Sequence, residues 1–405
     1  MDFAVIGLGS RGSLYASIIK EKYPDCKIVA VCDVEEYRLK VAKEKYGISD
    51  DMLFTNEDDF FAKGKLADAL IIGTIDKAHY KEAIRAMEVG YDMIMEKPMS
   101  PDQEECKEIV ATAKKFGRKI AICHVLRYTP FYSEIKKIIE RGDIGTVVTM
   151  SQTENVAYWH QAHSFVRGNW HNSKESSPMI LQKCCHDLDI IRWLMDKSCL
   201  FVSSFGSLMH FNKENAPEGS AENCLDCKLD CIYNSAKWYK TKEGSGWFPG
   251  KKHGIDDVDE AMRVLPYGKC VYKCDNDVVD HQVVNMLFED GATAQLTMTA
   301  FSQRNYRELH IHGTKGEIIG DMENKYFDVT IFGKGTERVD ITKLGIDLSG
   351  HGGGDIQLVK EFIEYVNGNC QARSSATASL ESHLMAFAAE QSRLEGGKVI
   401  PIITE

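Results

Sequence analysis

A glycine-rich loop at the start of the chain has the residue types and spacing that hold a pyrophosphate. Gly7, Gly9 and Gly12 form the pattern G-x-G-x-x-G, with Ser10 and Arg11 between the last two. The first glycine permits a tight turn, the second lets the main chain approach a phosphate, and the third lets helix and strand pack closely. A helix N-terminus after such a loop offers free N–H groups to phosphate oxygens. The loop therefore predicts dinucleotide binding.

The residues around the loop favour NAD as the dinucleotide. The apolar run 1–6 is typical of a buried strand, 13–21 has helical character, and the second apolar run 28–32 ends in Asp33. A carboxylate at this place accepts hydrogen bonds from the ribose hydroxyls of NAD and repels the 2′-phosphate of NADP. Arg38, one helical turn further on, keeps NADP as the less favoured alternative. The complete context makes a loop without a ligand the weaker interpretation.

The N-terminal part of the chain alternates strands and helices in the manner that positions such a loop. Further strands are expected at 69–73, 91–95 and 119–123, and helices at 35–46, 77–89 and 103–116. This alternation predicts a doubly wound parallel sheet, with a dinucleotide-binding Rossmann domain over residues 1–123. Thr74 and His79 follow the third of these strands and are expected to contact the cofactor.

The character of the chain changes in its second part. A helix at 131–141 is followed by strands at 146–153, 278–288, 293–301 and 308–313, with a hairpin turn at 289–291 and helices at 355–366 and 380–394. Alternating apolar and polar residues in these strands predict a mostly antiparallel open sheet. Residues 124–405 are therefore expected to form a second α/β domain. The stretch from about 205 to 275 has little periodicity and is interpreted as an insertion.

Four motifs in a fixed order give the chain a resemblance to a known family. They are the loop 7–12, Glu96-Lys97-Pro98 at a strand end, His186-Asp187-Leu188-Asp189 at a helix start, and Gly313-Thr314-Lys315-Gly316-Glu317. Together they resemble the Gfo/Idh/MocA family, which includes glucose–fructose oxidoreductase and inositol dehydrogenase. The resemblance implies a Rossmann domain, hydride transfer between NAD(P) and a carbon of a sugar or cyclitol, and a role for the second α/β domain (124–405) in substrate binding and oligomerisation.

The resemblance also implies which residues handle the proton. Lys97 matches the family's catalytic lysine, with Glu96 beside the cofactor, and His186 matches a second acid/base position. A lysine near the nicotinamide can polarise the substrate oxygen, and an imidazole can accept and return a proton. Asp189, one helical turn after His186, is expected to orient the imidazole. From the residues alone, an exposed lysine and a capped helix start remain the plainer alternatives.

The chain departs from the family pattern just before His186. Many members carry Asp four residues upstream, and here that residue is Gln182. Lys183 follows and is expected to supply a second cation or donor to the substrate. The loss of a carboxylate questions the usual Asp–His–Lys relay. The pair Cys184-Cys185 is interpreted as packing.

Several polar and aromatic residues are candidates for contacts to a hydroxylated substrate, because sugars bind to hydrogen-bonding groups and aromatic faces. They are Arg127, His160, His163, Arg167, Trp170 and His281. For each of them taken alone, a solvated loop residue is an equally good interpretation.

The insertion contains a cluster of cysteines. Cys224, Cys227 and Cys231 form C-x2-C-x3-C, and Cys270 and Cys274 follow. Three close thiolates with a fourth nearby are typical of tetrahedral structural zinc, with Cys270 favoured as the fourth ligand over Cys274. An iron–sulfur cluster is the second candidate and free thiols the third.

Composition excludes some classes of partner and location. The 405 residues carry a net charge of −11 and are 43% hydrophobic, which argues against nucleic acid and anionic membranes as partners. No apolar run reaches the length of a membrane span, and the first strand begins without a basic leader. Buried-type cysteines in apolar segments are typical of a reducing compartment, so a cytoplasmic location is expected.

Three hypotheses on function follow. The favoured one is an NAD-dependent oxidoreductase acting on a secondary hydroxyl of a sugar, glycoside or cyclitol, as a homodimer or homotetramer. The second is NAD-dependent glycoside cleavage through transient oxidation at C3 and elimination. The third is an NAD-sensing protein without activity, which would not need Lys97. The identity of the sugar, the carbon oxidised and the direction of the reaction depend on a pocket built from distant loops.

Overall fold

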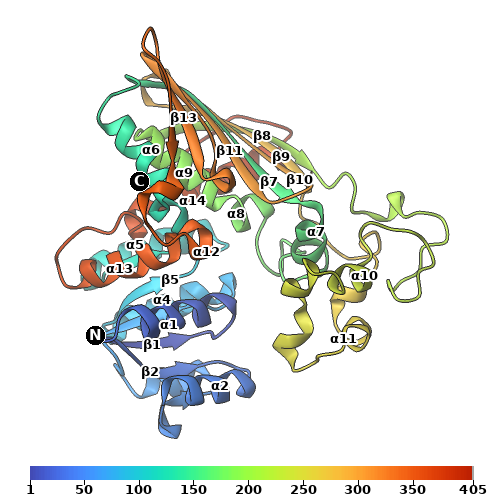
Figure 1. Ribbon diagram of the computed structural model, residues 1–405. Helices are drawn as coiled ribbons and strands as arrows, with labels where there is room; N and C mark the ends of the chain where they lie inside the picture. The colour runs from blue at the N-terminus through green and yellow to red at the C-terminus, as the bar shows by residue number, and fades with distance from the viewer. Residues whose placement is uncertain (404–405) are drawn as a thin grey trace.

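Two sheets of different construction organise the chain (Figure 1). The computed structural model describes residues 1–403. The first sheet has six parallel strands in the order β3-β2-β1-β4-β5-β6. These strands are β1 (Asp2–Ile6), β2 (Lys27–Cys32), β3 (Leu53–Phe54), β4 (Ala69–Ile72), β5 (Asp92–Met95) and β6 (Ile120–Ile122). Its helices are α1 (Ser10–Lys22), α2 (Glu36–Tyr46), α3 (Glu57–Ala62), α4 (Asp76–Val89) and α5 (Gln103–Phe116).

The expected doubly wound sheet is confirmed. Its central strands β1 and β4 are almost wholly buried, because helices cover both faces. The two-residue strand β3 was not predicted, because it is too short to show a periodic pattern.

The second sheet has nine strands in the order β14-β13-β12-β11-β7-β10-β9-β8-β15. They are β7 (Val147–Ala157), β8 (Cys199–Ser207), β9 (His281–Phe288), β10 (Thr293–Ser302), β11 (Tyr306–Gly313), β12 (Gly316–Asp321), β13 (Tyr326–Ile331), β14 (Gly335–Asp340) and β15 (Ile400–Pro401). Only β7 and β10 pair in parallel, so the expectation of a mostly antiparallel sheet is confirmed. The hairpin turn at Glu289–Gly291 joins β9 to β10 as expected.

One face of this sheet packs on helices and the other lies open. Residues of α6 (Pro130–Glu140), α9 (Cys185–Met195) and α14 (Ala376–Leu394) share its core. Along β11, Leu309 and Ile311 point into this core, while His310 and His312 lie on the open face. The alternation is the period-two pattern of a half-buried strand.

The C-terminal helix α13 (Gly354–Val366) returns to the N-terminal sheet. Its Leu358, Val359 and Phe362 are buried in the same cluster as Phe3 of β1. Figure 1 shows α13 lying next to α1. Helix α13 therefore packs on the first sheet although it lies far from that sheet in the chain, and no local pattern of α13 indicates this packing.

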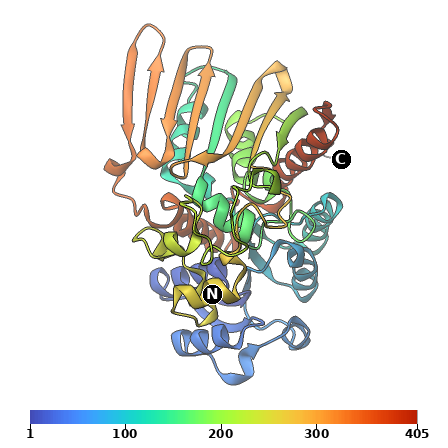
Figure 2. The same ribbon diagram turned by 90° about the vertical axis from the view of Figure 1, so that its right-hand side faces the viewer.

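The insertion lies between β8 and β9, at residues 208–280, and is slightly longer than the expected 205–275. It contains the short helices α10 (Ser235–Tyr239) and α11 (Val258–Val264), which share a small core of their own. Burial and the charge of Arg38, which belongs to α2, lower the pKa of Lys252 in the insertion. Figure 2 draws the insertion (yellow) in front of the N-terminal domain, and Figure 1 shows the two as separate lobes. Within residues 1–403, no helix is both long and apolar enough to cross a membrane.

Candidate active site

The glycine loop has the close main-chain contacts that its sequence predicts. Gly7 has φ +84°, and a Cβ on it would lie 2.6 Å from the main-chain nitrogen of Thr74. A Cβ on Gly12 would collide with the carbonyl of Gly7. A Cβ on Gly9 would meet nothing closer than 3.9 Å, so the N-terminus of α1 stays open on that side. The loop therefore fits a pyrophosphate at the helix start.

Asp33 lies buried at the end of β2 and is tied to the glycine loop. Its Oδ2 accepts a hydrogen bond from the main-chain nitrogen of Leu8 at 2.6 Å, and its Oδ1 accepts one from Glu35 at 2.9 Å. One nitrogen of Arg38 lies 3.3 Å from both carboxylate oxygens. The acid is thus fixed beside the loop, where an adenosine ribose would bind.

Arg11 connects the glycine loop to two distant segments. Its Nε donates to Glu96 at 2.7 Å, and a second nitrogen donates to Asp355 of α13 at 2.6 Å. Burial alone would raise the pKa of Glu96, but the charges of Arg11 and Lys97 outweigh it and hold that pKa below its usual range. Arg11 therefore holds the strand end beside Lys97 in place.

Thr74 and His79 hold the loops after β4 and β5 together. The Thr74 hydroxyl donates to Glu82 at 2.6 Å. The His79 ring lies 2.7 Å from the carbonyl oxygen of Pro98 and 3.3 Å from that of Thr74. His79 is 1% exposed, and both of its ring nitrogens face main-chain oxygens of the protein, so its expected contact with the cofactor stays a prediction.

Lys97 of the first domain contacts Gln182, four residues before His186 of the second domain. Lys97 Nζ donates to the main-chain oxygen of Gln182 at 2.6 Å and lies 3.3 Å from its side-chain oxygen. Burial and the positive charge of Lys97 hold the pKa of His186 well below its usual range. His186 is therefore a neutral imidazole that can accept a proton.

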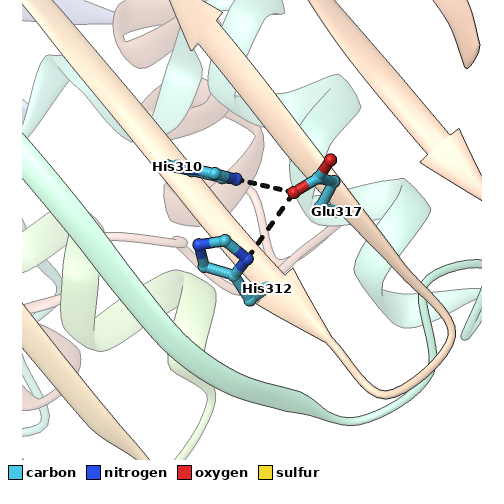
Figure 3. A group of neighbouring side chains, drawn as sticks. All are labelled: His310, His312 and Glu317. Carbon is cyan, nitrogen blue, oxygen red and sulfur yellow. Dashed lines mark hydrogen bonds and ion pairs between the residues drawn. The ribbon is translucent and has the colours of Figure 1, made fainter.

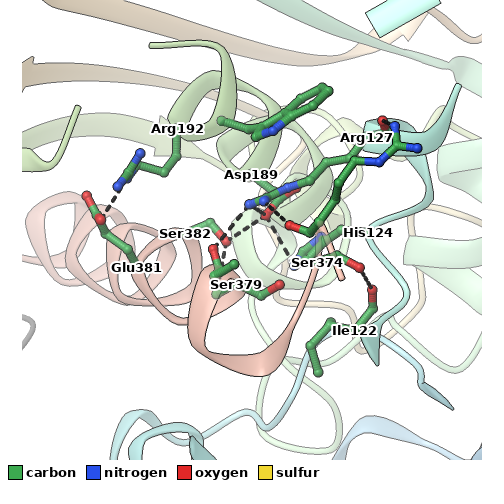
Figure 4. Close-up of polar contacts among 12 residues, drawn as sticks. Ile122, His124, Arg127, Asp189, Arg192, Ser374, Ser379, Glu381 and Ser382 are labelled. Carbon is green, nitrogen blue, oxygen red and sulfur yellow. Dashed lines mark hydrogen bonds and ion pairs between the residues drawn. The ribbon is translucent and has the colours of Figure 1, made fainter. Parts of the chain in front are cut away.

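Asp189 does not orient His186, contrary to expectation. Its two oxygens accept hydrogen bonds from Arg127 at 2.7 Å each, and Figure 4 shows this pair next to Ser382 of α14. Arg127 is 3% exposed and also donates to the carbonyl oxygen of Arg373. The contacts of Arg127 are therefore to the protein, and its contact with substrate stays a prediction. The pair locks α9, which carries His186, to the end of β6 and to α14.

Two further histidines, His124 and His383, lie near His186 and were not predicted from the sequence. His124 lies 5.7 Å from the ring of His186 and 5.4 Å from that of His383. His383 accepts a hydrogen bond from the main-chain nitrogen of Met99 at 3.0 Å, and its other nitrogen lies 2.8 Å from the carbonyl oxygen of Ser379. Helix α14 thus supports the loop that follows Lys97. These histidines belong to no local motif that could have indicated them.

Lys183 forms an ion pair in a buried network. Its Nζ lies 3.1 Å from Glu154 of β7, whose second oxygen lies 2.7 Å from Arg307. Arg307 also pairs with Asp187 at 2.9 Å. The two carboxylates and the two cationic side chains balance one another's charge, which offsets the free-energy cost of burying them. The network holds Lys183 in place. Burial and the charge of Lys183 lower the pKa of His160 to about 3.

His160 and His163 lie where the insertion meets the helical segment after β7. His160 Nδ1 is 2.9 Å from the side-chain oxygen of Asn305, and His163 Nδ1 is 2.5 Å from the hydroxyl of Tyr239. Trp247 of the insertion lies 4.8 Å from the ring of His160 and 5.5 Å from that of His163. The insertion therefore supplies an aromatic wall beside these histidines.

The remaining candidates lie elsewhere. Arg167 is buried and donates to the carbonyl oxygens of Lys269 and Tyr233, so its expected contact with substrate is replaced by a contact within the insertion. Trp170 is half-exposed and lines a separate hollow with Ile75. His281 begins β9 and lies 2.9 Å from Asp280. The structure does not bring these residues together with Lys97.

The cysteines do not have the spacing of a zinc site. In residues 1–403, only His310, His312 and Glu317 form a group of three ligand atoms within 4.8 Å of one another. Figure 3 shows them on the open face of the second sheet. Sulfurs around one zinc lie about 3.8 Å apart, since each bond is about 2.3 Å long. The expectation of tetrahedral zinc in the insertion is therefore not supported.

The fold and this site together define a two-domain, dinucleotide-dependent oxidoreductase. Residues 1–124 match the model of an oxidoreductase family with an NAD-binding Rossmann fold, and residues 136–401 match the C-terminal α/β domain of the same family. The chain belongs to the Gfo/Idh/MocA oxidoreductase family.

Individual relatives are distant. The Bacillus subtilis (strain 168) protein YteT, named as an oxidoreductase, is 23% identical over 77% of this chain and 74% of its own length. An inositol 2-dehydrogenase/D-chiro-inositol 3-dehydrogenase of Lactiplantibacillus plantarum is 24% identical over 52% of this chain and 57% of its own. The match thus spans little more than half of that enzyme.

Solved structures share the fold at low identity. An oxidoreductase from Agrobacterium radiobacter in complex with NAD+, L-tartaric acid and magnesium has a TM-score of 0.72 and 16% identity, over 99% of this chain and 98% of its own. The WlbA dehydrogenase from Bordetella pertussis, in complex with NADH and UDP-GlcNAcA, has a TM-score of 0.70 and 18% identity, over 100% and 98%.

Proposed function

We propose that this protein is an NAD-dependent oxidoreductase that moves hydride between the nicotinamide and a secondary hydroxyl-bearing carbon of a sugar, glycoside or cyclitol. The single observation that carries the proposal is the contact of Lys97 with the oxygens of Gln182, four residues before His186, across the two domains. The relatives named for inositol oxidation and the neighbour that holds a nucleotide sugar support this class of substrate.

Lys97 and His186 have different roles at the substrate hydroxyl. NAD, when bound, accepts the hydride from the carbon. Lys97 donates a hydrogen bond to the substrate oxygen and stabilises the negative charge that develops there. His186 is the residue proposed to take the hydroxyl proton, and burial with the charge of Lys97 holds its pKa well below its usual range, so it is neutral before that step. Gln182 holds Lys97 through two oxygens without adding charge.

NAD is the proposed cofactor because Asp33 is rigidly held beside the loop. Its two hydrogen bonds from Leu8 and Glu35 leave no room for the carboxylate to turn away from a ribose. A 2′-phosphate would meet this negative charge. Arg38 is already occupied by the same carboxylate, so it offers NADP little compensation.

The activity is tested by mixing the protein with NAD+ and a panel of free sugars, glycosides and cyclitols, and following NADH by absorbance. We expect formation of NADH with at least one member and none with Lys97→Ala. A parallel set of p-nitrophenyl glycosides without added NAD tests the glycoside-cleaving alternative. Release of nitrophenol there, without net NADH, would overturn simple dehydrogenation. NAD binding without turnover on any panel member, and a function unaffected by Lys97→Ala, would favour an NAD sensor.

The open face of the second sheet supports a homodimer or homotetramer. It carries exposed apolar side chains, among them Phe201, Leu287 and Val399, which line one shallow hollow. Contiguous apolar surface of this kind is typical of a protein interface. Light scattering on the purified protein should show at least two chains per particle, and Leu287→Glu should reduce that number.

A further inference from the structure

Two histidines and a glutamate gather on the open face of the second sheet (Figure 3). His310 and His312 lie on the same face of β11, because side chains two residues apart in a strand point the same way. Glu317 comes from the neighbouring strand β12, where it is paired with His312 in the antiparallel register. Two adjacent strands thus bring together two imidazole nitrogens and one carboxylate oxygen.

The spacing of these atoms matches the spacing of ligands around a single metal ion. The Nε2 of His310 lies 2.9 Å from the Oε2 of Glu317, and the Nδ1 of His312 lies 3.6 Å from the same oxygen. Zinc binds imidazole nitrogen and carboxylate oxygen at about 2.0–2.2 Å, so neighbouring ligand atoms of a tetrahedral site lie about 3.3–3.5 Å apart. The two distances lie on either side of this range, so small rotations of the side chains would complete the site.

Hydrogen bonding between the side chains accounts for only part of this arrangement. His310 lies at hydrogen-bond distance from Glu317. His312, at 3.6 Å, is too far from the carboxylate for a hydrogen bond, yet the centre of its ring lies 3.7 Å from that of His310. A metal ion between the three side chains would bind the His312 nitrogen and would balance the charge of Glu317.

The types of ligand atom indicate which ion fits. Imidazole suits zinc and other late first-row metals, whereas Ca²⁺ and Mg²⁺ prefer sites made of oxygen atoms. Two histidines and one glutamate are among the ligand sets that hold zinc in proteins, with water in the fourth position. The three side chains are between 28% and 42% exposed, so an ion and its water can reach them from the solvent.

We propose that His310, His312 and Glu317 bind one Zn²⁺ ion on the open face of the second sheet, with water as the fourth ligand. The ion joins β11 to β12. This site is separate from the candidate active site, because α9, which carries His186, packs on the opposite face of the sheet. His312 also lines the shallow hollow that contains Leu287, so the ion lies at the edge of the surface proposed for oligomerisation.

Isothermal titration calorimetry on the full-length protein tests this site. The protein is dialysed against a chelator, kept reduced, and then titrated with Zn²⁺. We expect saturable binding by the wild type. His310→Gln and His312→Gln should each weaken it by at least about tenfold, because each removes a ligand of the ion. His253→Gln, which replaces an exposed histidine of the insertion, is the matched control and should bind Zn²⁺ like the wild type.

Far-UV circular dichroism and the melting temperature of the metal-free variants serve as the control for folding. Wild-type values show that a loss of Zn²⁺ binding reports the loss of a ligand. Absence of saturable binding by the wild type, or wild-type affinity in either His310→Gln or His312→Gln, would overturn the proposal. Binding that is lost only in Cys224→Ser would also overturn it, because thiols of the insertion would then hold the ion.

Discussion

The side-chain nitrogen of Lys97 lies 2.6 Å from the main-chain oxygen of Gln182 and 3.3 Å from its side-chain oxygen. These contacts join the end of β5 in one domain to the segment just before α9 in the other. A residue that departs from the family pattern therefore still holds the lysine, but as a neutral amide. The two oxygens of Gln182 orient Lys97, and His186 follows four residues later.

Removal of the Lys97 amine should abolish turnover while the cofactor still binds. We expect Lys97→Ala to lower kcat by about 10²–10⁴-fold, the range for a group that assists proton transfer. The dissociation constant for NAD, measured by quenching of protein fluorescence, should change less than about threefold. Lys114→Ala, on the exposed side of α5, is the matched control and should keep full activity. A Lys97→Ala protein with wild-type kcat would contradict the assigned role.

Loss of the Gln182 side chain should have a smaller effect than loss of Lys97. Gln182→Leu removes the contact at 3.3 Å and keeps the main-chain contact at 2.6 Å. One hydrogen bond contributes about 0.5–1.5 kcal/mol, so kcat should fall about 2- to 12-fold. Steady-state kinetics on the best substrate of the panel measure the change. A loss as large as that of Lys97→Ala would mean that the side-chain amide has a direct role in the reaction.

A neutral residue at position 33 should weaken the preference for NAD. Asp33→Asn removes the charge that repels a 2′-phosphate and frees Arg38 to attract it. The ratio of kcat/KM for NAD to that for NADP should fall by about tenfold or more, which corresponds to about 1.4 kcal/mol. Glu35→Gln removes an equal charge from an exposed neighbour and should leave the ratio unchanged. An unaltered ratio in Asp33→Asn would assign cofactor choice to other residues.

Buried neutral histidines should make the protein less stable in mild acid. Burial lowers the pKa of His160, His163 and His383 to about 3 each, whereas an unfolded chain has histidines that titrate near pH 6.5. Below about pH 6.5 the unfolded state binds more protons, so stability falls as the pH falls towards the folded-state pKa values. Each such histidine contributes a loss of about 2 kcal/mol between about pH 6.5 and pH 5.

Urea unfolding of His383→Gln at several pH values tests this dependence. Its free energy of unfolding should be lower throughout, but it should lose about 2 kcal/mol less than the wild type between about pH 6.5 and pH 5. His253→Gln, which replaces an exposed histidine, should show the wild-type dependence. Equal slopes for His383→Gln and the wild type would mean that His383 is already protonated in the folded protein.

The buried pair between Arg127 and Asp189 should be important for stability. Both side chains are almost wholly buried, so Asp189→Asn leaves an uncompensated cation and should cost about 3–5 kcal/mol in the free energy of unfolding. Asp328→Asn breaks the more exposed pair with Arg338 and should have no measurable effect. Thermal unfolding of both variants gives the comparison. A small change in Asp189→Asn would show that water or the nearby serines compensate Arg127.

Local patterns in the sequence were enough to predict the N-terminal sheet and its glycine loop. The glycine loop, Asp33 and the strand-helix alternation act over short stretches, because main-chain conformation and burial on both faces restrict each residue directly. The positions of Lys97 and His186 at the ends of elements followed from the resemblance. The antiparallel character of the second sheet was visible in its period-two strands.

Contacts between distant segments were decided only by the tertiary structure. Asp189 took Arg127 as its partner instead of His186, and His383 came from α14 to hold the loop after Lys97, because burial leaves each polar group only the partners that packing brings near. The separation of the cysteine sulfurs in the insertion was also decided only by the tertiary structure. The spacing of these cysteines in the chain allowed zinc or a cluster, but the folded insertion brings no three of their sulfurs within 4.8 Å of one another.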